Sequence, residues 1–150
     1  MVMGDVPAET DVAVIGGGVG GYSAAFHAAD LGLEVTLVNE EPRLGGVCLL
    51  RGCIPAKTLF SLCDLLLSAR DAASRGIRFD DPEIDLEKIR EWKDRVVDRL
   101  TGGLDKLARD RSVNLIQGRA RFAGPDRLHV HGEEEVDLSF KHAILASGSR

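Results

Sequence analysis

The chain has 150 residues, of which 44% are hydrophobic and 29% are charged, and its formal net charge is −5. This balance is normal for one globular domain with its own core, and the negative charge argues against nucleic acid or an anionic membrane surface as a partner. No apolar run approaches the roughly 20 residues of a membrane span, and three cysteines are too few for a disulfide-stapled secreted scaffold.

The first ten residues contain acidic side chains and no basic ones, which fits neither a secretory signal nor a transit peptide. We therefore expect a soluble, cytoplasmic protein. The chain stops just after a new apolar run and a polar turn, so we also expect it to be a fragment of a longer protein.

A β–α–β unit is predicted at the start of the chain. Residues 11–15 form a short β-branched run that is typical of a buried strand, and residues 22–31 have helical composition. Gly32 closes that helix, and residues 34–38 form a second apolar strand. The unit has the size that dinucleotide-binding units have, about 30 residues.

Gly16, Gly18 and Gly21 lie between the first strand and the helix with G-x-G-x-x-G spacing. These glycines permit the tight turn, the approach of a pyrophosphate and close packing of the helix on the strand. The pyrophosphate would lie at the N-terminus of the helix, where unpaired N–H groups and the helix dipole favour an anion. We expect an adenine dinucleotide here, and the unit alone leaves open whether it is FAD or NAD.

An acid at the end of the second strand usually binds the ribose hydroxyls of such a dinucleotide. Here the amide Asn39 follows the strand directly and the acid is Glu40. Which of the two faces the ribose stays open, and a solvated loop charge is the alternative.

Residues 44–59, LGGVCLLRGCIPAKTL, place Cys48 and Cys53 five positions apart. Neither a regular helix nor a straight strand brings such residues within disulfide distance, so a bond between them needs a distorted segment. Gly52 and Pro55 lie where this distortion can occur. Cys53 is then expected at or just before a helix N-terminus, which stabilises a thiolate, with the positive charge of Lys57 one turn further on.

This pattern favours a reactive thiol pair over two inert core cysteines. Half of a zinc site is the alternative, but the spacing is unusual for zinc and no second Cys/His pair follows. Cys63 lies on the apolar face of the next predicted helix, where we expect it to pack in the core.

Two long helices are predicted over residues 55–74 and 85–110, the second with Asp85 as its N-cap, and we expect them to form an antiparallel pair. The apolar stripe of the second helix is read as core, although a subunit interface would also fit. Short strands are predicted after them, at residues 113–116, 119–122, 128–130, 136–138 and 142–146, the last of them buried.

His129 and His131 would share one strand face, as a metal-binding pair might. The sequence around them suggests nothing that completes a site, so an ordinary exposed strand is favoured and no metal is expected. The acidic run after them, residues 133–135, is read as a solvated hairpin tip.

Three motifs together resemble the flavoprotein disulfide reductases, most closely the branch that oxidises dihydrolipoamide: GGGVGG after residues 11–15, the cysteine stretch at residues 44–59, and ILASGSR at residues 144–150. The resemblance covers essentially the whole chain. It implies an α/β fold, namely part of a Rossmann-like FAD-binding domain with a parallel sheet, a long helix pair and a small antiparallel β-meander.

The resemblance also implies roles for individual residues. Cys48 and Cys53 would form a redox-active disulfide, in which Cys48 exchanges with the dithiol and Cys53 contacts the flavin, with Lys57 near the flavin. The remaining FAD contacts that it implies are the glycine motif, Asn39, Glu40, Gly45, Gly46, Val47, Cys48, Ala120, Ser147, Gly148 and Ser149.

Electrons would pass from the dithiol to the disulfide, then to FAD and then to NAD. The dithiol would be dihydrolipoamide, presented by the lipoyl domain of a 2-oxoacid dehydrogenase complex. The NAD-binding domain, the dimerisation domain and a His–Glu acid/base pair from the partner subunit would come after residue 150, so the full-length protein is expected to be a homodimer and this chain alone inactive. Alternatives are another disulfide reductase, acting on glutathione or mercuric ion, and a non-catalytic nucleotide-binding module with a structural disulfide.

Overall fold

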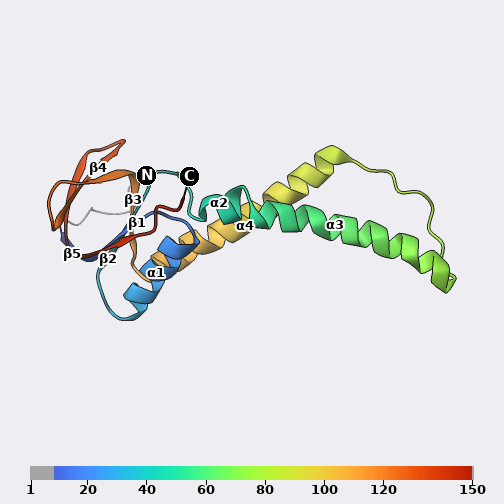
Figure 1. Cartoon of the computed structure of the whole chain (residues 1–150), viewed down its shortest axis with the longest axis horizontal. Coiled ribbons are helices and arrows are strands. Elements are labelled where there is room, and N and C mark those ends of the chain that lie inside the picture. Colours follow the sequence, from blue (N-terminus) through green and yellow to red (C-terminus); the bar gives the residue numbers. More distant parts are fainter. Residues whose placement is uncertain (1–8, 150) are drawn as a thin grey trace.

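The computed structural model describes residues 9–149. Most of the first ten residues, on which the expectation about a secretory signal or transit peptide rests, therefore lie outside the described residues. A closed sheet forms the body of the protein (Figure 1). Its strands are β1 (Glu9–Ile15), β2 (Val35–Asn39), β3 (Asn114–Phe122), β4 (Arg127–Gly132) and β5 (Val136–Leu145).

Two kinds of strand pairing share this sheet. β1 pairs in parallel with β2 and with β5, and β2 pairs in parallel with β3. The β3–β4 and β4–β5 pairs are antiparallel. The predicted parallel sheet and antiparallel meander are both confirmed, and β3 and β5 belong to both.

The prediction of separate strands at residues 113–116 and 119–122 is wrong, because β3 is continuous and changes partner along its length. It pairs with β2 up to Gln117 and with β4 from Gly118 onward. A Cβ on Gly118 would lie 2.6 Å from the carbonyl oxygen of His131, so this glycine marks a close strand contact rather than a strand end. β5 is continuous in the same way, since Ser139 is paired with Glu9 of β1 and with Arg127 of β4.

The parallel strands contribute side chains to two hydrophobic clusters, one on each face of the sheet. Inside the barrel, Ala13, Val38, Ile116, Leu128, Val130, Leu138 and Phe140 form one cluster. The other cluster lies between the strands and the helices and contains Val12, Val14, Ala25, Ala28, Val35, Leu37, Leu44, Ala108 and Val113. The second half of β5 is different from the prediction, because Ile144 and Leu145 are 37% and 67% exposed and nothing within residues 9–149 covers that face.

The helices are α1 (Val19–Asp30), α2 (Gly46–Leu50), α3 (Cys53–Asp71), the 3₁₀ turn η1 (Ala72–Arg75) and α4 (Leu86–Asp110). Gly32 after α1 and Gly76 after η1 have positive φ angles of 83° and 91°, as helix-ending glycines do. Asp85 caps α4 by accepting hydrogen bonds from the backbone N–H groups of Glu87 and Lys88. The predicted helix limits are confirmed to within a few residues.

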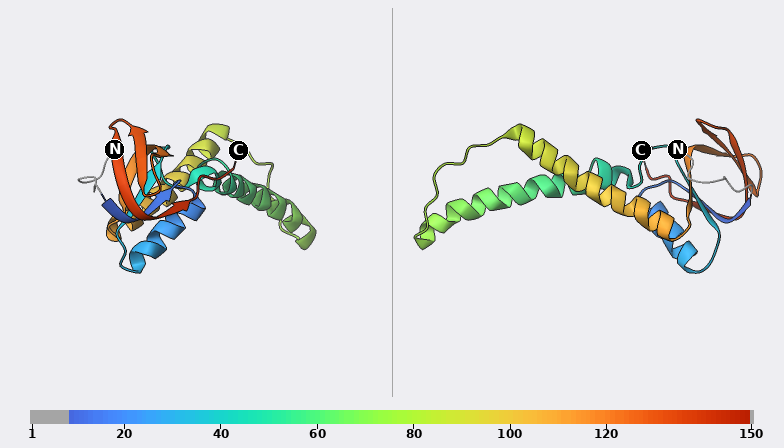
Figure 2. Two further views of the ribbon diagram at one scale, coloured as in Figure 1. Left: turned by 60° about the vertical axis from the view of Figure 1, so that its left-hand side comes forward. Right: turned by 180° about the vertical axis from the view of Figure 1, so that it is seen from behind.

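α3 and α4 run in opposite directions, cross beside α2 and diverge away from the barrel (Figures 1 and 2). Because of this divergence most of α3 is exposed, including Phe60 and Leu65, which are 67% and 64% exposed. The prediction that Cys63 packs in the core is wrong, because its side chain is exposed. By length and composition alone, Gly46–Arg75 is long and apolar enough to cross a membrane, so the expectation that no segment of the chain approaches a membrane span is wrong.

Candidate functional site

The glycine-rich turn connects β1 to α1 and can be built only with glycine at two of its positions. Gly16 has a φ angle of +112°, and a Cβ there would lie 2.3 Å from the carbonyl oxygen of Ala146. A Cβ on Gly21 would lie 1.7 Å from the carbonyl oxygen of Gly16. The first and third glycines of the predicted motif therefore have the roles that the motif assigns them.

The start of α1 is open to an anion. Gly18 is its N-cap, and a Cβ on Gly18 would have no neighbour nearer than Gly46 Cα, at 4.0 Å. Within the described residues, the cap receives no side-chain hydrogen bond and the first turn contains no acidic residue. The first N–H groups of α1 therefore have the arrangement that binds a phosphate at a helix N-terminus, and these residues fit a dinucleotide.

The cysteine stretch lies directly against this turn. The N–H group of Gly45 donates a hydrogen bond of 2.8 Å to the carbonyl oxygen of Gly17. Gly46 has a φ angle of +59°, and a Cβ on it would lie 2.7 Å from Gly18 Cα. Two segments far apart in the sequence are thus in backbone contact, and Val47, next in the chain, is 64% exposed beside them.

The end of β5 reaches the same turn. The N–H group of Ala146 donates a hydrogen bond of 2.8 Å to the carbonyl oxygen of Ile15. The exposed residues Ser147, Gly148 and Ser149 follow, and this end of the described chain lies beside α2 (Figure 1). The structure therefore brings the predicted motifs at residues 16–21, 44–59 and 144–149 together.

Asn39 and Glu40 have different environments. The Asn39 side chain accepts a hydrogen bond of 2.9 Å from the N–H group of Gly17 and donates to the carbonyl oxygens of Glu41 and Arg43, at 2.8 and 3.1 Å. Glu40 is more exposed, and its carboxylate lies 3.2 Å from Nε of Arg119 on β3. Asn39 thus fixes the loop and the turn, whereas Glu40 presents a carboxylate at the surface.

Sequence reasoning missed Gly17 and Arg119. A Cβ on Gly17 would come within 2.6 Å of the Asn39 side chain, and its place as the middle one of three consecutive glycines was the signal for such a contact. Ala120, beside Arg119, has its side chain packed against the barrel core, so only its backbone is placed to meet a ligand. Lys57, also a predicted site residue, is exposed on α3.

The two cysteines belong to different helices separated by a break. Cys48 lies in α2 and Cys53 opens α3. Gly52 between them has φ and ψ angles of −122° and −103°, and a Cβ there would lie 3.0 Å from the carbonyl oxygen of Val47. The predicted distortion is confirmed, with Pro55 in the first turn of α3 as expected.

The thiols are close enough to interact. A hydrogen bond to Cys53 raises the pKa of the Cys48 thiol, burial and the Cys53 charge act in the same direction, and the charge of Lys57 opposes them more weakly. Reduced Cys48 is therefore stabilised as a neutral thiol.

Cys48 and Cys53 also face different surroundings. Cys53 is exposed, whereas Cys48 opens into a cavity of about 410 Å³ between α1, α2, α3 and α4. The residues that line this cavity are Tyr22, Gly45, Cys48, Leu49, Ile54, Arg99, Leu100, Gly103, Leu104 and Leu107. A second cavity, of about 250 Å³, lies where the ends of β2 and β3 meet α4, with Asn39 and Arg43 among its lining residues.

Comparison with known proteins points to one family. The profile of the pyridine nucleotide-disulphide oxidoreductases matches residues 10–150. The chain is 47% identical over 154 residues to a dihydrolipoyl dehydrogenase of Halobacterium salinarum, covering 100% of the chain and 32% of that relative. It is 49% identical over 154 residues to dihydrolipoyl dehydrogenase 2 of Haloarcula marismortui, with the same shares covered.

A relative from Vibrio matches the chain with similar identity and coverage. The chain is 46% identical over 143 residues to a dihydrolipoyl dehydrogenase of Vibrio parahaemolyticus, covering 95% of the chain and 30% of the relative. The chain thus spans about a third of the length of the curated relatives that it matches.

Proposed function

The chain belongs to the pyridine nucleotide-disulphide oxidoreductase family, and on that premise we propose that it is the FAD-binding, disulfide-carrying part of a dihydrolipoyl dehydrogenase. The observation that supports this most strongly is the contact between the cysteine stretch and the dinucleotide turn. Because the Gly45 N–H group bonds to the Gly17 carbonyl oxygen, the thiol pair and the phosphate-binding helix start are parts of one site.

FAD, when bound, accepts the two electrons of the dithiol and passes them to NAD. In our proposal the N–H groups at the start of α1 would hold its pyrophosphate, together with the backbone from Gly45 to Val47. Glu40 receives the ribose hydroxyls because its carboxylate is exposed, while Asn39 holds the loop in place. The exposed backbone of Ser147, Gly148 and Ser149 would supply further contacts to it.

Cys48 and Cys53 undergo thiol–disulfide exchange with the substrate dithiol. One substrate thiolate attacks Sγ of Cys48, the Cys48–Cys53 bond breaks, and Cys53 leaves as a thiolate. The second substrate thiolate then attacks the substrate sulfur of the mixed disulfide, so that Cys48 is released and the substrate becomes a disulfide. Cys48 takes up a proton because its hydrogen bond to Cys53 raises its pKa, and the pair now holds the two electrons.

The shape of the site supports a dihydrolipoamide-type substrate over glutathione. Cys48 opens into the cavity of about 410 Å³, where Arg99 is the one charged side chain among the described residues that line it and leucines are the most frequent. An uncharged alkyl dithiol can bury its chain there, whereas the several charges of glutathione disulfide would lose water without gaining enough partners. We propose further that the dithiol is presented by the lipoyl domain of a 2-oxoacid dehydrogenase complex.

The cavity assignment is tested by a charge placed in its wall. In the protein expressed from its complete gene, Leu100→Glu should lower kcat/KM for dihydrolipoamide at least about tenfold, because it places a carboxylate in the cavity wall against the substrate chain. Leu86→Glu is the matched control, since Leu86 lies on the same helix, is 59% exposed and is not part of the cavity. Equal activity in the two variants, or faster turnover with glutathione disulfide than with dihydrolipoamide, would refute the proposed substrate.

A further inference from the structure

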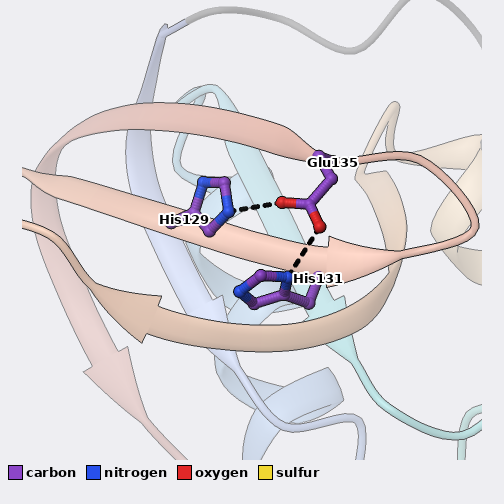
Figure 3. A group of neighbouring side chains, drawn as sticks. All are labelled: His129, His131 and Glu135. Atoms are coloured by element: carbon purple, nitrogen blue, oxygen red, sulfur yellow. Dashed lines mark hydrogen bonds and ion pairs between the residues drawn. The ribbon is translucent and has the colours of Figure 1, made fainter.

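The outer face of the β4–β5 hairpin carries two histidines and a glutamate in contact (Figure 3). Leu128 and Val130 of β4 point into the barrel and are fully buried. The alternation of a strand therefore places His129 and His131 together on the outside, where their rings lie 4.5 Å apart between centroids.

Glu135 completes the group, which corrects the expectation that nothing nearby does so. The pairing of His129 with Asp137 and of Val130 with Val136 sets the hairpin register, and this register brings residue 135 across from residue 131. The carboxylate lies between the two rings, 2.5 Å from Nε2 of His129 and 2.8 Å from Nδ1 of His131. The candidate ligand atoms of these three residues all lie within 4.8 Å of one another.

We propose that His129, His131 and Glu135 form a binding site for a divalent transition-metal ion of the zinc type. Two imidazole nitrogens and one carboxylate oxygen are the donor set of three-ligand zinc sites, which leave a further position to water. This set selects zinc, copper or nickel rather than magnesium or calcium, which take oxygen ligands. Tetrahedral zinc ligands lie about 3.3 Å apart, so the two contacts of Glu135, at 2.5 and 2.8 Å, need to open only slightly. The two histidine nitrogens lie within 4.8 Å of each other.

Asp137 supports the proposal independently of the three ligands. Its carboxylate lies 2.7 Å from Nδ1 of His129. When that nitrogen carries the proton, Nε2, which now shares a hydrogen bond with Glu135, is the ring nitrogen that the metal would bind. A carboxylate that holds a histidine in this tautomer is the usual outer partner of a metal-bound imidazole.

The surrounding charges permit a cation. Arg119 and Arg121 of β3 are paired with His131 and His129 in the sheet register and oppose a metal ion. Arg119, however, lies against Glu40, and the acidic run Glu133–Glu135 together with Asp137 adds negative charge on the other side. The group also lies on a hairpin that carries none of the cysteine or glycine-turn residues, so this proposal does not depend on the proposed enzyme function.

Calorimetric titration with Zn²⁺ tests the site in the protein expressed from its complete gene. The protein is first reduced and alkylated with iodoacetamide, so that no cysteine thiolate can bind the ion. We expect one saturable Zn²⁺ per chain, with affinity reduced at least about tenfold in each of His129→Gln, His131→Gln and Glu135→Gln, since each removes one of three ligands. Asp137→Asn should weaken binding about 10- to 100-fold.

His142→Gln is the matched control, because His142 is another exposed histidine of the sheet and lies outside the group. Its Zn²⁺ affinity should equal that of the wild type. Zn²⁺ should also raise the unfolding temperature of the wild type but not of His131→Gln, because only the folded state brings β4 and the turn before β5 together around the ion. Absence of saturable binding, equal binding by His131→Gln, or equally strong binding of Mg²⁺ would overturn the proposal.

Discussion

The side chain of Asn39 joins the end of β2 to the glycine turn, because its Oδ1 accepts a hydrogen bond of 2.9 Å from the N–H group of Gly17. Its amide nitrogen also donates to the carbonyl oxygens of Glu41 and Arg43. One amide therefore orders both the turn that receives the phosphates and the loop that leads to the cysteines. An acid at this position could accept the first bond but could not donate the other two.

Asn39→Asp should lower the free energy of unfolding by about 1–3 kcal/mol, because two carbonyl oxygens lose their donor and face a carboxylate instead. Urea unfolding of the chain and the variant measures the difference. Glu40→Gln is the control and should change stability by less than about 1 kcal/mol, since it removes only an exposed ion pair. An Asn39→Asp variant as stable as the wild type would show that the amide does not hold the loop.

Gly46→Ala should separate the cysteine stretch from the turn. The new Cβ would lie 2.7 Å from Gly18 Cα at a φ angle of +59°, and the backbone at Gly18 has to move away. We expect the amount of FAD bound per chain in the purified full-length variant, measured by flavin absorbance, to fall at least about tenfold. The reason is that the phosphate-binding turn is displaced.

Gly76→Ala is the control that distinguishes the steric clash with Gly18 from the strain of a positive φ angle. Gly76 also has a positive φ angle, +91°, but a Cβ there would have nothing within 4 Å. The variant should lose about 1–2 kcal/mol of stability and keep its FAD. Equal FAD loss in both variants would rule out the Gly18–Gly46 contact as the cause.

Alkylation of reduced Cys48 should need a higher pH than alkylation of an ordinary thiol. Its hydrogen bond to Cys53 raises its pKa, and only the thiolate reacts. Iodoacetamide labelling followed by peptide mass spectrometry, at a series of pH values, gives the midpoint for Cys48. In Cys53→Ala the midpoint should move down toward the ordinary thiol value, about 8.5; an unchanged midpoint would show that Cys53 does not cause the shift.

Asp11 should make folding sensitive to acid. The hydrogen bond from Lys141, together with that from the Glu34 N–H group, lowers the pKa of Asp11 below its ordinary value. The ionised carboxylate therefore stabilises the fold above that ordinary value, about 3.9, and the stabilisation is lost as the pH falls through the lowered pKa.

Asp11→Asn should consequently lose less stability than the wild type when the pH is lowered from about 5 to about 2. Urea unfolding midpoints over this range measure the two slopes. Asp80→Asn, in the exposed loop between η1 and α4, removes a carboxylate outside the sheet and should keep the wild-type slope. Identical slopes for the Asp11 variant and the wild type would contradict the assigned role of Lys141.

The sequence predicted those parts of the fold and the site that depend on local patterns. The β–α–β unit, the helix limits at Gly32 and Asp85, and the break between Cys48 and Cys53 each follow from residues a few positions apart. The sequence did not reveal the continuity of β3 and β5, because the change of strand partner at Gly118 and Ser139 depends on strands distant in the chain.

Three other features were missed for the same physical reason. Glu135 joins His129 and His131 only through the exact register of a hairpin, and a shift of one residue would put it on the other face. The hydrogen bond of Asn39 to Gly17 connects two separate loops, so the sequence did not show it and left open whether Asn39 or Glu40 faces the ribose. Cys63 has the spacing of a core residue, but α3 diverges from α4 and leaves it exposed.

The absorption spectrum of the protein expressed from its complete gene tests the central claim most directly. We predict a yellow protein with bound FAD and, after two-electron reduction, a long-wavelength band from contact between the Cys53 thiolate and the flavin. Cys53→Ser should abolish this band, whereas Cys48→Ser should retain it. A colourless protein, as expected for a module with a merely structural disulfide, or a band that survives in Cys53→Ser, would contradict the account.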